Sequence, residues 1–300
     1  MPSTCHILIS EGPEQDAFCE MTYLSVALCK RLYPESTATV LTDESTLANL
    51  ELLPYQFDRL QVIEIPEELS TGRQRSRYLK TRMRQFVEGD LVFIDADALP
   101  LHPFHEICDH GVTFAAALDR NRTSPEPAFP SWVIPHYNRL GWDWSPGDYF
   151  NSGVMFMADT PQMAEFSERW HGHWRRMLEE CGVPQDQPSL NHTLGEMGIA
   201  PHKLPVRFNA MVDASPYLAR GARIVHYFLR GDGQPDPLSL LSHLIRHLRE
   251  TGGVDWEAVE HAARTSDAWI HPTSSVHIEL ATRHPFHAFR IAASRALQRQ

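Results

Sequence analysis

The sequence predicts an α/β fold, in which a mostly parallel sheet is flanked by helices and followed by a helical extension. Through the first half of the 300-residue chain, short apolar runs alternate with longer amphipathic patterns. Strands that alternate with helices form βαβ units, and such units build parallel sheets. The length allows one large α/β domain or two smaller ones, with a sizeable core. Beyond about residue 236 the apolar spacing is helical, which predicts the extension.

The first six elements follow from apolar runs and their spacing. Strands are predicted at residues 5–10, 37–42, 60–65 and 91–94, where the apolar stretches have strand length. Between them, helices are predicted over residues 15–32, ending near Pro34, and over the basic stretch 73–87. Sheets of this kind bind ligands beyond the carboxyl ends of their strands, so functional residues are expected there.

The second half begins less regularly. A predicted strand at 112–118 is followed by a segment rich in Pro, Trp and Tyr over residues 119–150, a length typical of functional loops. Further strands are predicted at 152–158 and 224–227, and helices at 161–180, 189–197, 238–250 and 254–264. We therefore expect a main domain over residues 1–235 and a helical extension with a basic tail over residues 236–300.

Composition argues against several classes of protein. The chain has 27 Lys and Arg against 38 Asp and Glu, a net charge of −11, so nucleic acid is not an expected partner. Neither a Gly-x-Gly-x-x-Gly loop after the first strand nor a Walker-type loop occurs, which argues against a dinucleotide cradle or P-loop. The five cysteines are scattered and are expected to be reduced packing residues. Without a signal-peptide pattern or an apolar run of membrane length, the expected location is cytoplasmic.

The strongest chemical signal is LVFIDADAL at residues 91–99, where an apolar strand delivers Asp95 and Asp97 at its carboxyl end. Alternation points residues i and i+2 to the same side of an extended chain, so both carboxylates can face one cation. Oxygen ligands select a hard ion such as Mg²⁺ or Mn²⁺, which can neutralise a diphosphate. The alternative is a pair of turn-capping aspartates at a strand end.

Four blocks resemble the retaining glycosyltransferases of the GT-A fold, most closely family 8, which includes glycogenin and bacterial lipopolysaccharide galactosyl- and glucosyltransferases. The blocks are FIDAD at 93–97, YFNSGV at 149–154, QDQPSLN at 185–191 and VHY at 225–227, and they occur in the family's order. The resemblance implies a GT-A-like nucleotide-diphospho-sugar transferase fold over the main domain. It also implies metal-dependent, retaining transfer of a hexose from UDP-glucose or UDP-galactose to an acceptor hydroxyl on a carbohydrate, lipid-linked or protein acceptor.

The resemblance assigns roles to residues in these blocks. Asp95 and Asp97 are implied to bind Mn²⁺ (or Mg²⁺) that bridges the donor diphosphate, with His226 as the third protein ligand. Asn151 is implied to hydrogen-bond the donor sugar, and Gly153 to let the backbone approach closely. Read without the family, His226 is a core histidine, and Asn151 and Gly153 belong to a turn before a strand.

Three further residues complete the implied site. Asp186 and Gln187 match the family's acid–amide pair, in which the aspartate holds sugar hydroxyls and the amide lies near the anomeric carbon. Asp186 is also a suitable cap for the helix that follows. Lys80 matches a basic residue that contacts the donor phosphates, and its alternative is a solvated cation on a basic helix. Without a strong carboxylate nucleophile, front-face attack by the acceptor hydroxyl is implied, with Gln187 lining the opposite face.

The chain departs from the family pattern at two positions. After its histidine the family often carries a lysine that supports the leaving phosphate, whereas here Arg230 substitutes by charge but not by position. Pro188 replaces a frequent acid, which leaves the recognition of sugar hydroxyls open. The family contacts uridine at the ends of its first strands, which correspond here to residues 10–11 and 42–43.

Two groups lie outside these blocks. In segment 119–150, an aromatic acceptor platform is one interpretation, and anchoring to the core is expected for at least half of Trp132, Tyr137, Trp142, Trp144, Tyr149 and Phe150. The histidine pairs 171/173 and 243/247 have spacings compatible with zinc. Since no Cys or acidic partner stands beside them in a recognised pattern, structural or solvated roles are expected.

Two other functions and one surface remain open. A haloacid-dehalogenase-type phosphatase also carries Asp-x-Asp after an apolar strand, although Leu99 stands where that class has Thr or Val. A nucleotide-sugar-binding module with degenerate catalysis is the second alternative, motivated by the missing lysine.

The tail, residues 281–300, carries four arginines and no acidic residue, and its apolar residues recur at helical spacing. Such a helix suits either peripheral contact with an anionic membrane or docking on the domain.

Overall fold

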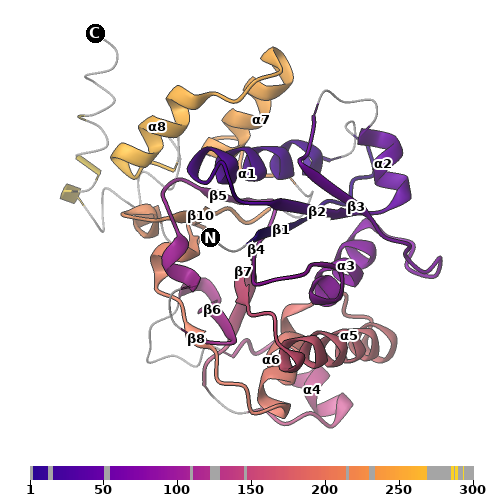
Figure 1. Cartoon of the computed structure of the whole chain (residues 1–300). Helices are drawn as coiled ribbons and strands as arrows, with labels where there is room; N and C mark the ends of the chain where they lie inside the picture. Colours follow the sequence, from indigo (N-terminus) through magenta and orange to yellow (C-terminus); the bar gives the residue numbers. More distant parts are fainter. Residues whose placement is uncertain are drawn as a thin grey trace.

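The computed structural model describes residues 3–12, 16–50, 55–108, 111–121, 129–144, 147–213, 216–229 and 234–268, with short stretches at 285–286, 288–289 and 293. Within them the chain is an α/β protein with a seven-stranded sheet, helices on both faces, and a three-stranded sheet beside it (Figure 1). The predicted α/β class, the largely parallel sheet and the helical extension are confirmed.

The larger sheet has the strand order β3-β2-β1-β4-β7-β6-β8. Its strands are β1 (Ser3–Ile7), β2 (Ala38–Thr42), β3 (Arg59–Val62), β4 (Leu91–Ile94), β6 (Phe114–Leu118), β7 (Phe150–Met157) and β8 (His202–Lys203). All neighbouring pairs are parallel except the two that involve β7, which runs antiparallel to both β4 and β6. Strand β4 lies in the middle and is fully buried.

The direction of β7 decides where its first residues lie. Because β7 is antiparallel to β4, Val154 near its start pairs with Ile94 at the end of β4. The Asp95 amide then donates to the Gly153 carbonyl at 2.8 Å. The start of β7 and the carboxyl ends of the parallel strands therefore share one edge of the sheet.

The smaller sheet brings a late strand to the same edge. Its strands are β5 (Ala98–Pro100), β9 (Ala210–Met211) and β10 (Ile224–His226), with β10 antiparallel to β5 and parallel to β9. His226 pairs with Ala98 in this register. The Tyr227 amide donates to the Asp97 carbonyl at 2.9 Å, so residue 226 lies next to the turn that carries the two aspartates.

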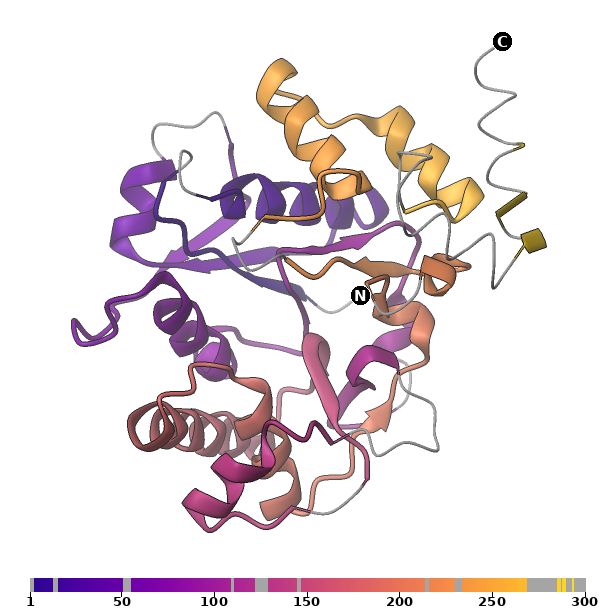
Figure 2. The same cartoon turned by 180° about the vertical axis from the view of Figure 1, so that it is seen from behind.

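Two helical layers cover the large sheet (Figures 1 and 2). On one face lie α3 (Gly72–Phe86), α5 (Pro161–Cys181) and α6 (Gln187–Glu196), with α4 (Ile134–Leu140) beside α5. On the other lie α1 (Phe18–Leu32) and the smaller sheet, and the extension helices α7 (Leu240–Thr251) and α8 (Trp256–Thr265) share a buried apolar cluster with α1. Helix α2 (Glu44–Leu50) follows β2. Trp170, Trp174 and Phe166 of α5 are fully buried and belong to the core between this layer and the sheet.

Local sequence explains where the long helices begin and end. Helix α3 starts at a capping box, in which the Thr71 hydroxyl accepts from the Gln74 amide and the Gln74 side chain accepts from the Thr71 amide. Helix α5 starts at a Thr160 cap followed by Pro161 and ends at Gly182, whose φ of 67° is left-handed. These caps fix where α3 begins and where α5 begins and ends.

The structure corrects several predicted boundaries. The strand predicted over residues 5–10 lies at Ser3–Ile7, and the one predicted over 60–65 lies at Arg59–Val62. The segment 119–150 contains a helix, α4, that the irregular pattern did not predict. Helix α2 and strands β5, β8 and β9 also went unpredicted, because elements of two to seven residues leave no readable periodicity.

Some sequence predictions concern residues that lie wholly or partly outside the described ranges. Arg230 and most of residues 281–300 lie outside the described residues, although Phe286 and Phe289 are described and exposed. All five cysteines lie in the described residues, and no two of them form a disulfide. In the described part of the chain, no helix combines the length and apolar character that crossing a bilayer requires.

Candidate functional site

Three ligand-type side chains converge at the carboxyl edge of β4. Asp95 and Asp97 lie in the tight turn between β4 and β5, where the Ala98 amide donates to the Asp95 carbonyl at 3.0 Å. His226 ends β10, and its Nε2 lies 3.3 Å from Asp97 Oδ1. One ligand atom from each residue lies within 4.8 Å of the other two. Carboxylate and imidazole ligands in this arrangement fit a divalent cation such as Mn²⁺ or Mg²⁺.

The orientation of the His226 ring is set by an asparagine. Its Nδ1 lies 2.8 Å from Asn209 Oδ1, and a carbonyl oxygen only accepts, so Nδ1 carries the proton. Asn209 is fully buried and donates from its own Nδ2 to Asn151 Oδ1 at 3.0 Å. Nε2 of His226 is thereby turned toward Asp97, which is the orientation that a metal ligand requires.

Burial and charge act in opposite directions on His226. Burial disfavours the imidazolium, but Asp97 and Asp95 outweigh burial and raise the pKa of His226 above its ordinary value. A cation that binds here therefore displaces a proton from the ring as the pH falls toward that pKa. Metal affinity at this cluster is expected to weaken in acid.

Gly153 makes room for the His226 ring. A Cβ on Gly153 would lie 2.2 Å from Cε1 and 2.8 Å from Nδ1 of His226, and 2.9 Å from Asn151 Oδ1. Real Cβ contacts are not that short, so any side chain at 153 displaces the ring or the asparagine. The sequence argument gave Gly153 a role in backbone approach, and the structure adds this steric one.

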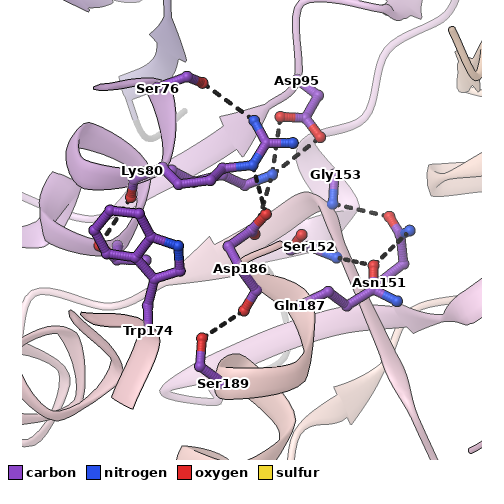
Figure 3. A network of polar contacts seen from close by, with 12 residues as sticks. Ser76, Lys80, Asp95, Asn151, Ser152, Gly153, Trp174, Asp186, Gln187 and Ser189 are labelled. Carbon is purple, nitrogen blue, oxygen red and sulfur yellow. Dashed lines mark hydrogen bonds and ion pairs between the residues drawn. The ribbon is translucent and has the colours of Figure 1, made fainter. Parts of the chain in front are cut away.

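A buried lysine lies between two carboxylates (Figure 3). Lys80 Nζ is 3.0 Å and 3.1 Å from the two oxygens of Asp95, and 3.5 Å from Asp186 Oδ2. Arg77, one turn earlier on α3, places Nε 2.7 Å from Asp186 Oδ1. Only 1% of the Lys80 surface is exposed, so the interpretation of Lys80 as a solvated cation is wrong.

The pKa values of Asp186 and Asp95, the two carboxylates around Lys80, are shifted in opposite directions. Burial alone would raise the pKa of Asp186, but Lys80 and Arg77 lower it to about 2, so Asp186 is ionised at neutral pH. For Asp95, burial and repulsion from Asp97 outweigh Lys80 and Arg77, and the pKa is raised. A divalent cation would relieve the repulsion between Asp95 and Asp97.

Asp186 and Gln187 lie where α6 begins, against the start of β7 (Figure 3). Gln187 Oε1 accepts from Asn151 Nδ2 at 3.1 Å and from the Ser152 amide at 3.4 Å. The Asp186 side chain makes no helix-capping hydrogen bond, so the capping interpretation is wrong and its carboxylate serves the cations of α3 instead. Asn151 Nδ2 also donates to Asp119 Oδ1 at 3.1 Å, which ties the end of β6 to this group.

The structure therefore brings together the residues that the resemblance implied, which are Lys80, Asp95, Asp97, Asn151, Gly153, Asp186, Gln187 and His226. It adds Arg77, Asp119 and Asn209, which the sequence argument missed. Arg77 precedes Lys80 by three positions and therefore shares its helix face, and Asp119 directly follows a strand. Both residues could therefore have been predicted from the sequence. Asn209 lies in an irregular stretch before a two-residue strand and could not be predicted in this way.

A second polar group lies at the ends of β1 and β2, where contacts to a base were predicted. Arg75 Nη1 is 2.5 Å from Asp43 Oδ2, and Arg75 Nη2 is 3.9 Å from Glu11 Oε1. The Gly72 amide donates to the same Glu11 oxygen at 2.9 Å. The two predicted positions, 10–11 and 42–43, are thus joined through one arginine of α3.

The aromatic residues of segment 119–150 divide into buried and exposed groups. Tyr137, Trp142, Tyr149 and Phe150 are buried, which confirms that at least half of the six anchor the segment to the core. Trp132 and Trp144 are 48% and 39% exposed and remain available as a platform.

The two histidine pairs differ: His243 and His247 both contact Asp255, whereas the members of the pair 171/173 have separate partners. His171 Nδ1 lies 2.8 Å from Thr81 Oγ1, whereas His173 Nδ1 lies 3.0 Å from Thr193 Oγ1. No sequence pattern beside these histidines indicated an acidic partner, and residues outside the pairs supply one. Glu196 lies 3.6 Å from His173, and Asp255 lies 2.8 Å from His243.

Comparisons with known proteins find fold-level likeness alone. No protein-family model matches the chain, and no curated protein matches it. The apo crystal structure of mouse xyloside xylosyltransferase 1 is similar, with a TM-score of 0.49 and 15% identity over 79% of this chain and 100% of that one. A glycosyltransferase involved in glycosylation of the major capsid of PBCV-1 is similar with a TM-score of 0.46 and 12% identity, over 75% of this chain and 93% of that one. Both are described as glycosyltransferases, and the functional conclusion has to come from the site.

Proposed function

We propose that this chain is a metal-dependent, retaining glycosyltransferase of GT-A type that transfers a hexose from UDP-glucose or UDP-galactose to an acceptor hydroxyl. The observation that carries the proposal is the cluster of Asp95, Asp97 and His226, with ligand atoms within 4.8 Å, directly beside a buried Lys80. A cation site next to a buried lysine suits a diphosphate, which carries several negative charges. The resemblance of these residues to the motifs of glycosyltransferase family 8 also supports the proposal.

In this proposal, Asp95, Asp97 and His226 hold Mn²⁺ or Mg²⁺, which when bound supplies Lewis-acid stabilisation of charge on the departing diphosphate. Lys80 is buried beside Asp95, so water would not screen the attraction between its charge and the phosphates of the proposed donor. Asn209 keeps the His226 ring turned toward Asp97. Glu11, Asp43 and Arg75 surround the position proposed for the base.

The donor sugar is proposed to lie against the group of Asn151, Asp186 and Gln187. Asp186 is ionised above about pH 2, so its carboxylate accepts hydrogen bonds from sugar hydroxyls. Gln187 is held by Asn151 and the Ser152 amide, which fixes the amide beside the proposed anomeric carbon. The bond from the anomeric carbon to the diphosphate breaks, the acceptor oxygen bonds to the same face, and the acceptor proton passes to a diphosphate oxygen.

The phosphatase alternative is less well supported. It requires an acidic pair at the end of a later strand beside the Asp-x-Asp turn. The strands next to β4 are β1 and β7, and at this edge β7 offers Asn151 and Ser152. A degenerate binding module keeps the same donor site and differs only in turnover, so activity distinguishes it.

The test is to incubate the protein with UDP-glucose or UDP-galactose and Mn²⁺ and to measure UDP release and Mn²⁺-dependent UDP binding. We expect Asp95→Asn and Asp97→Asn each to abolish metal-dependent binding. Asp97→Asn should leave the fold nearly intact, because loss of a ligand charge opens no cavity, whereas Asp95→Asn also removes a charged partner of the buried Lys80 and should lower stability. The exposed Asp143→Asn serves as the matched control. Wild-type affinity in either site variant contradicts the metal assignment, phosphate release from a generic ester indicates the phosphatase, and tight binding without turnover indicates the module.

A further inference from the structure

A second cluster of metal-ligating side chains lies between α5 and α6. His173 comes from α5, and His192 and Glu196 come from α6, where a spacing of four residues puts them on one helix face. One ligand atom from each of the three lies within 4.8 Å of the others. Among the described residues, this cluster and that of Asp95, Asp97 and His226 are the two groups with such geometry.

The separations are close to those of a tetrahedral zinc site. Two ligand atoms that are each about 2.1 Å from zinc at a tetrahedral angle lie about 3.4 Å apart. His173 Nε2 and Glu196 Oε2 are already 3.6 Å apart. The His192 ligand atom lies within 4.8 Å of the other two, so side-chain rotation would complete a three-ligand set, and a water molecule would fill the fourth position.

The hydrogen bonds around His173 leave the correct nitrogen for a metal. Thr193 Oγ1 donates its single proton to the Ser189 carbonyl at 2.7 Å, so the same oxygen can only accept from His173 Nδ1 at 3.0 Å. The ring is therefore protonated at Nδ1, and Nε2 presents its lone pair toward Glu196. An outer hydrogen bond that fixes the tautomer in this way is characteristic of metal-binding histidines.

The second imidazole is also held in place. The Trp142 ring stacks on His192 with centroids 4.0 Å apart and an interplanar angle of 6°, and the two histidine rings lie 4.6 Å apart. The His192 ring is therefore fixed beside that of His173.

The carboxylate is available for a metal. Arg169 Nη1 lies 3.6 Å from Glu196 Oε2, but Arg169 makes its shorter contacts, at 2.8 Å and 3.0 Å, with Glu165. Glu196 is exposed, so releasing this long ion pair has a small effect on stability.

We propose that His173, His192 and Glu196 form a binding site for Zn²⁺ or a similar transition-metal ion, separate from the Asp95, Asp97 and His226 cluster. Two imidazoles and one carboxylate select zinc over the hard ions that an aspartate-rich site prefers. The ion would join α5 to α6, whose first residue is Gln187. The inference rests on the geometry of these three residues and is independent of the proposed function.

The test measures Zn²⁺ binding by calorimetry and Co²⁺ binding by visible absorption on the full chain after chelator treatment. To remove metal binding at the cluster of Asp95, Asp97 and His226, all titrations use a protein that carries Asp97→Asn. We expect one bound ion, and an affinity at least about 100-fold weaker in His173→Gln and in Glu196→Gln, since even outer-shell changes cost 10- to 100-fold. Glu196→Gln keeps the shape of an exposed residue, so it tests the site without threatening the fold. The exposed His105→Gln is the matched control and should bind like the background protein.

Two outcomes overturn the proposal. The first is the absence of Zn²⁺ and Co²⁺ binding in the Asp97→Asn background. The second is binding that persists unchanged in both His173→Gln and Glu196→Gln, because the ion then lies elsewhere.

Discussion

Replacing Gly153 by alanine tests whether this position exists to accommodate the His226 ring. The new Cβ would lie 2.2 Å from His226 Cε1 and 2.9 Å from Asn151 Oδ1. Carbon atoms in contact are ordinarily about 3.5–4.0 Å apart, so the ring has to move by more than about 1 Å. It is held by Asn209 on one side and Asp97 on the other, so it cannot move without losing one of them.

Both stability and metal binding are expected to suffer. Overpacking of a buried site costs about 1–3 kcal/mol, and at about 2 °C per kcal/mol for a chain of this size Tm falls by about 2–6 °C. Metal sites tolerate ligand displacements of about 0.2 Å, so a displaced His226 stops acting as a ligand. Mn²⁺-dependent UDP affinity should fall at least about tenfold.

Thermal unfolding and calorimetry with UDP and Mn²⁺ measure the two effects. Gly172→Ala is the control, because a Cβ there meets nothing within 4 Å and alanine favours the α5 helix by about 0.5–1 kcal/mol. In a double-mutant cycle, Gly153→Ala with His226→Ala should be more stable than the two single changes predict together, because the clash is removed. An additive cycle, or a Gly153→Ala protein with wild-type Tm and UDP affinity, refutes the steric reasoning.

Four further predictions concern the same edge of the sheet and the tail. Gln187→Ala should lower kcat more than donor affinity, and an unchanged kcat at saturating donor and acceptor would remove it from the site. Because the pKa of Asp186 is lowered from 3.8 to about 2, the Asp186 carboxylate contributes about 2 kcal/mol of stability that is present above about pH 4 and lost as the pH falls toward 2; in Asp186→Asn, urea unfolding should show that acid dependence flattened. Asn209→Ala should weaken Mn²⁺-dependent UDP binding by about 10- to 100-fold, and no change would show that His226 needs no such orientation. Truncation after Thr282 should reduce co-sedimentation with anionic vesicles if the tail binds membranes, and equal partitioning of both forms would discard that reading.

The parts of the fold that the sequence predicts well are those with long or strongly apolar patterns. Strand β4 was predicted with its observed bounds. Asp95 and Asp97 were expected to face one cation through alternation along an extended chain, whereas the structure brings them together in a tight turn. Alternation gives no strand direction, however, so the antiparallel course of β7 could not be deduced. The position of His226 depends on β5, β9 and β10, which have only two or three residues each.

Contacts between distant elements explain the remaining differences. Lys80 is buried because it meets Asp95 and Asp186, which lie 15 and 106 positions further along the chain. Asp186 is the N-cap residue of α6, but its side chain meets the cations of α3 instead of capping the helix, since pairing a buried charge outweighs one cap. His173 finds its partners on α6 rather than two residues away, because two residues on one helix point in different directions.

The way in which β6 and β7 are joined bears on how such a protein can diversify. Leu118 pairs with Phe150, and the Asp119 amide donates to the Tyr149 carbonyl at 2.8 Å, so the intervening segment leaves and re-enters the sheet at one point. Both of its ends lie at the edge that carries the candidate site. The segment is thus a loop closed at its base, and changes around the exposed Trp132 and Trp144 can leave the sheet register unaltered. The buried Tyr137, Trp142 and Tyr149 have to be kept, because they anchor the segment to the core. Under the proposed function, exchanging the exposed part of this segment is a route to new acceptor preference, with the proposed donor-binding residues left in place.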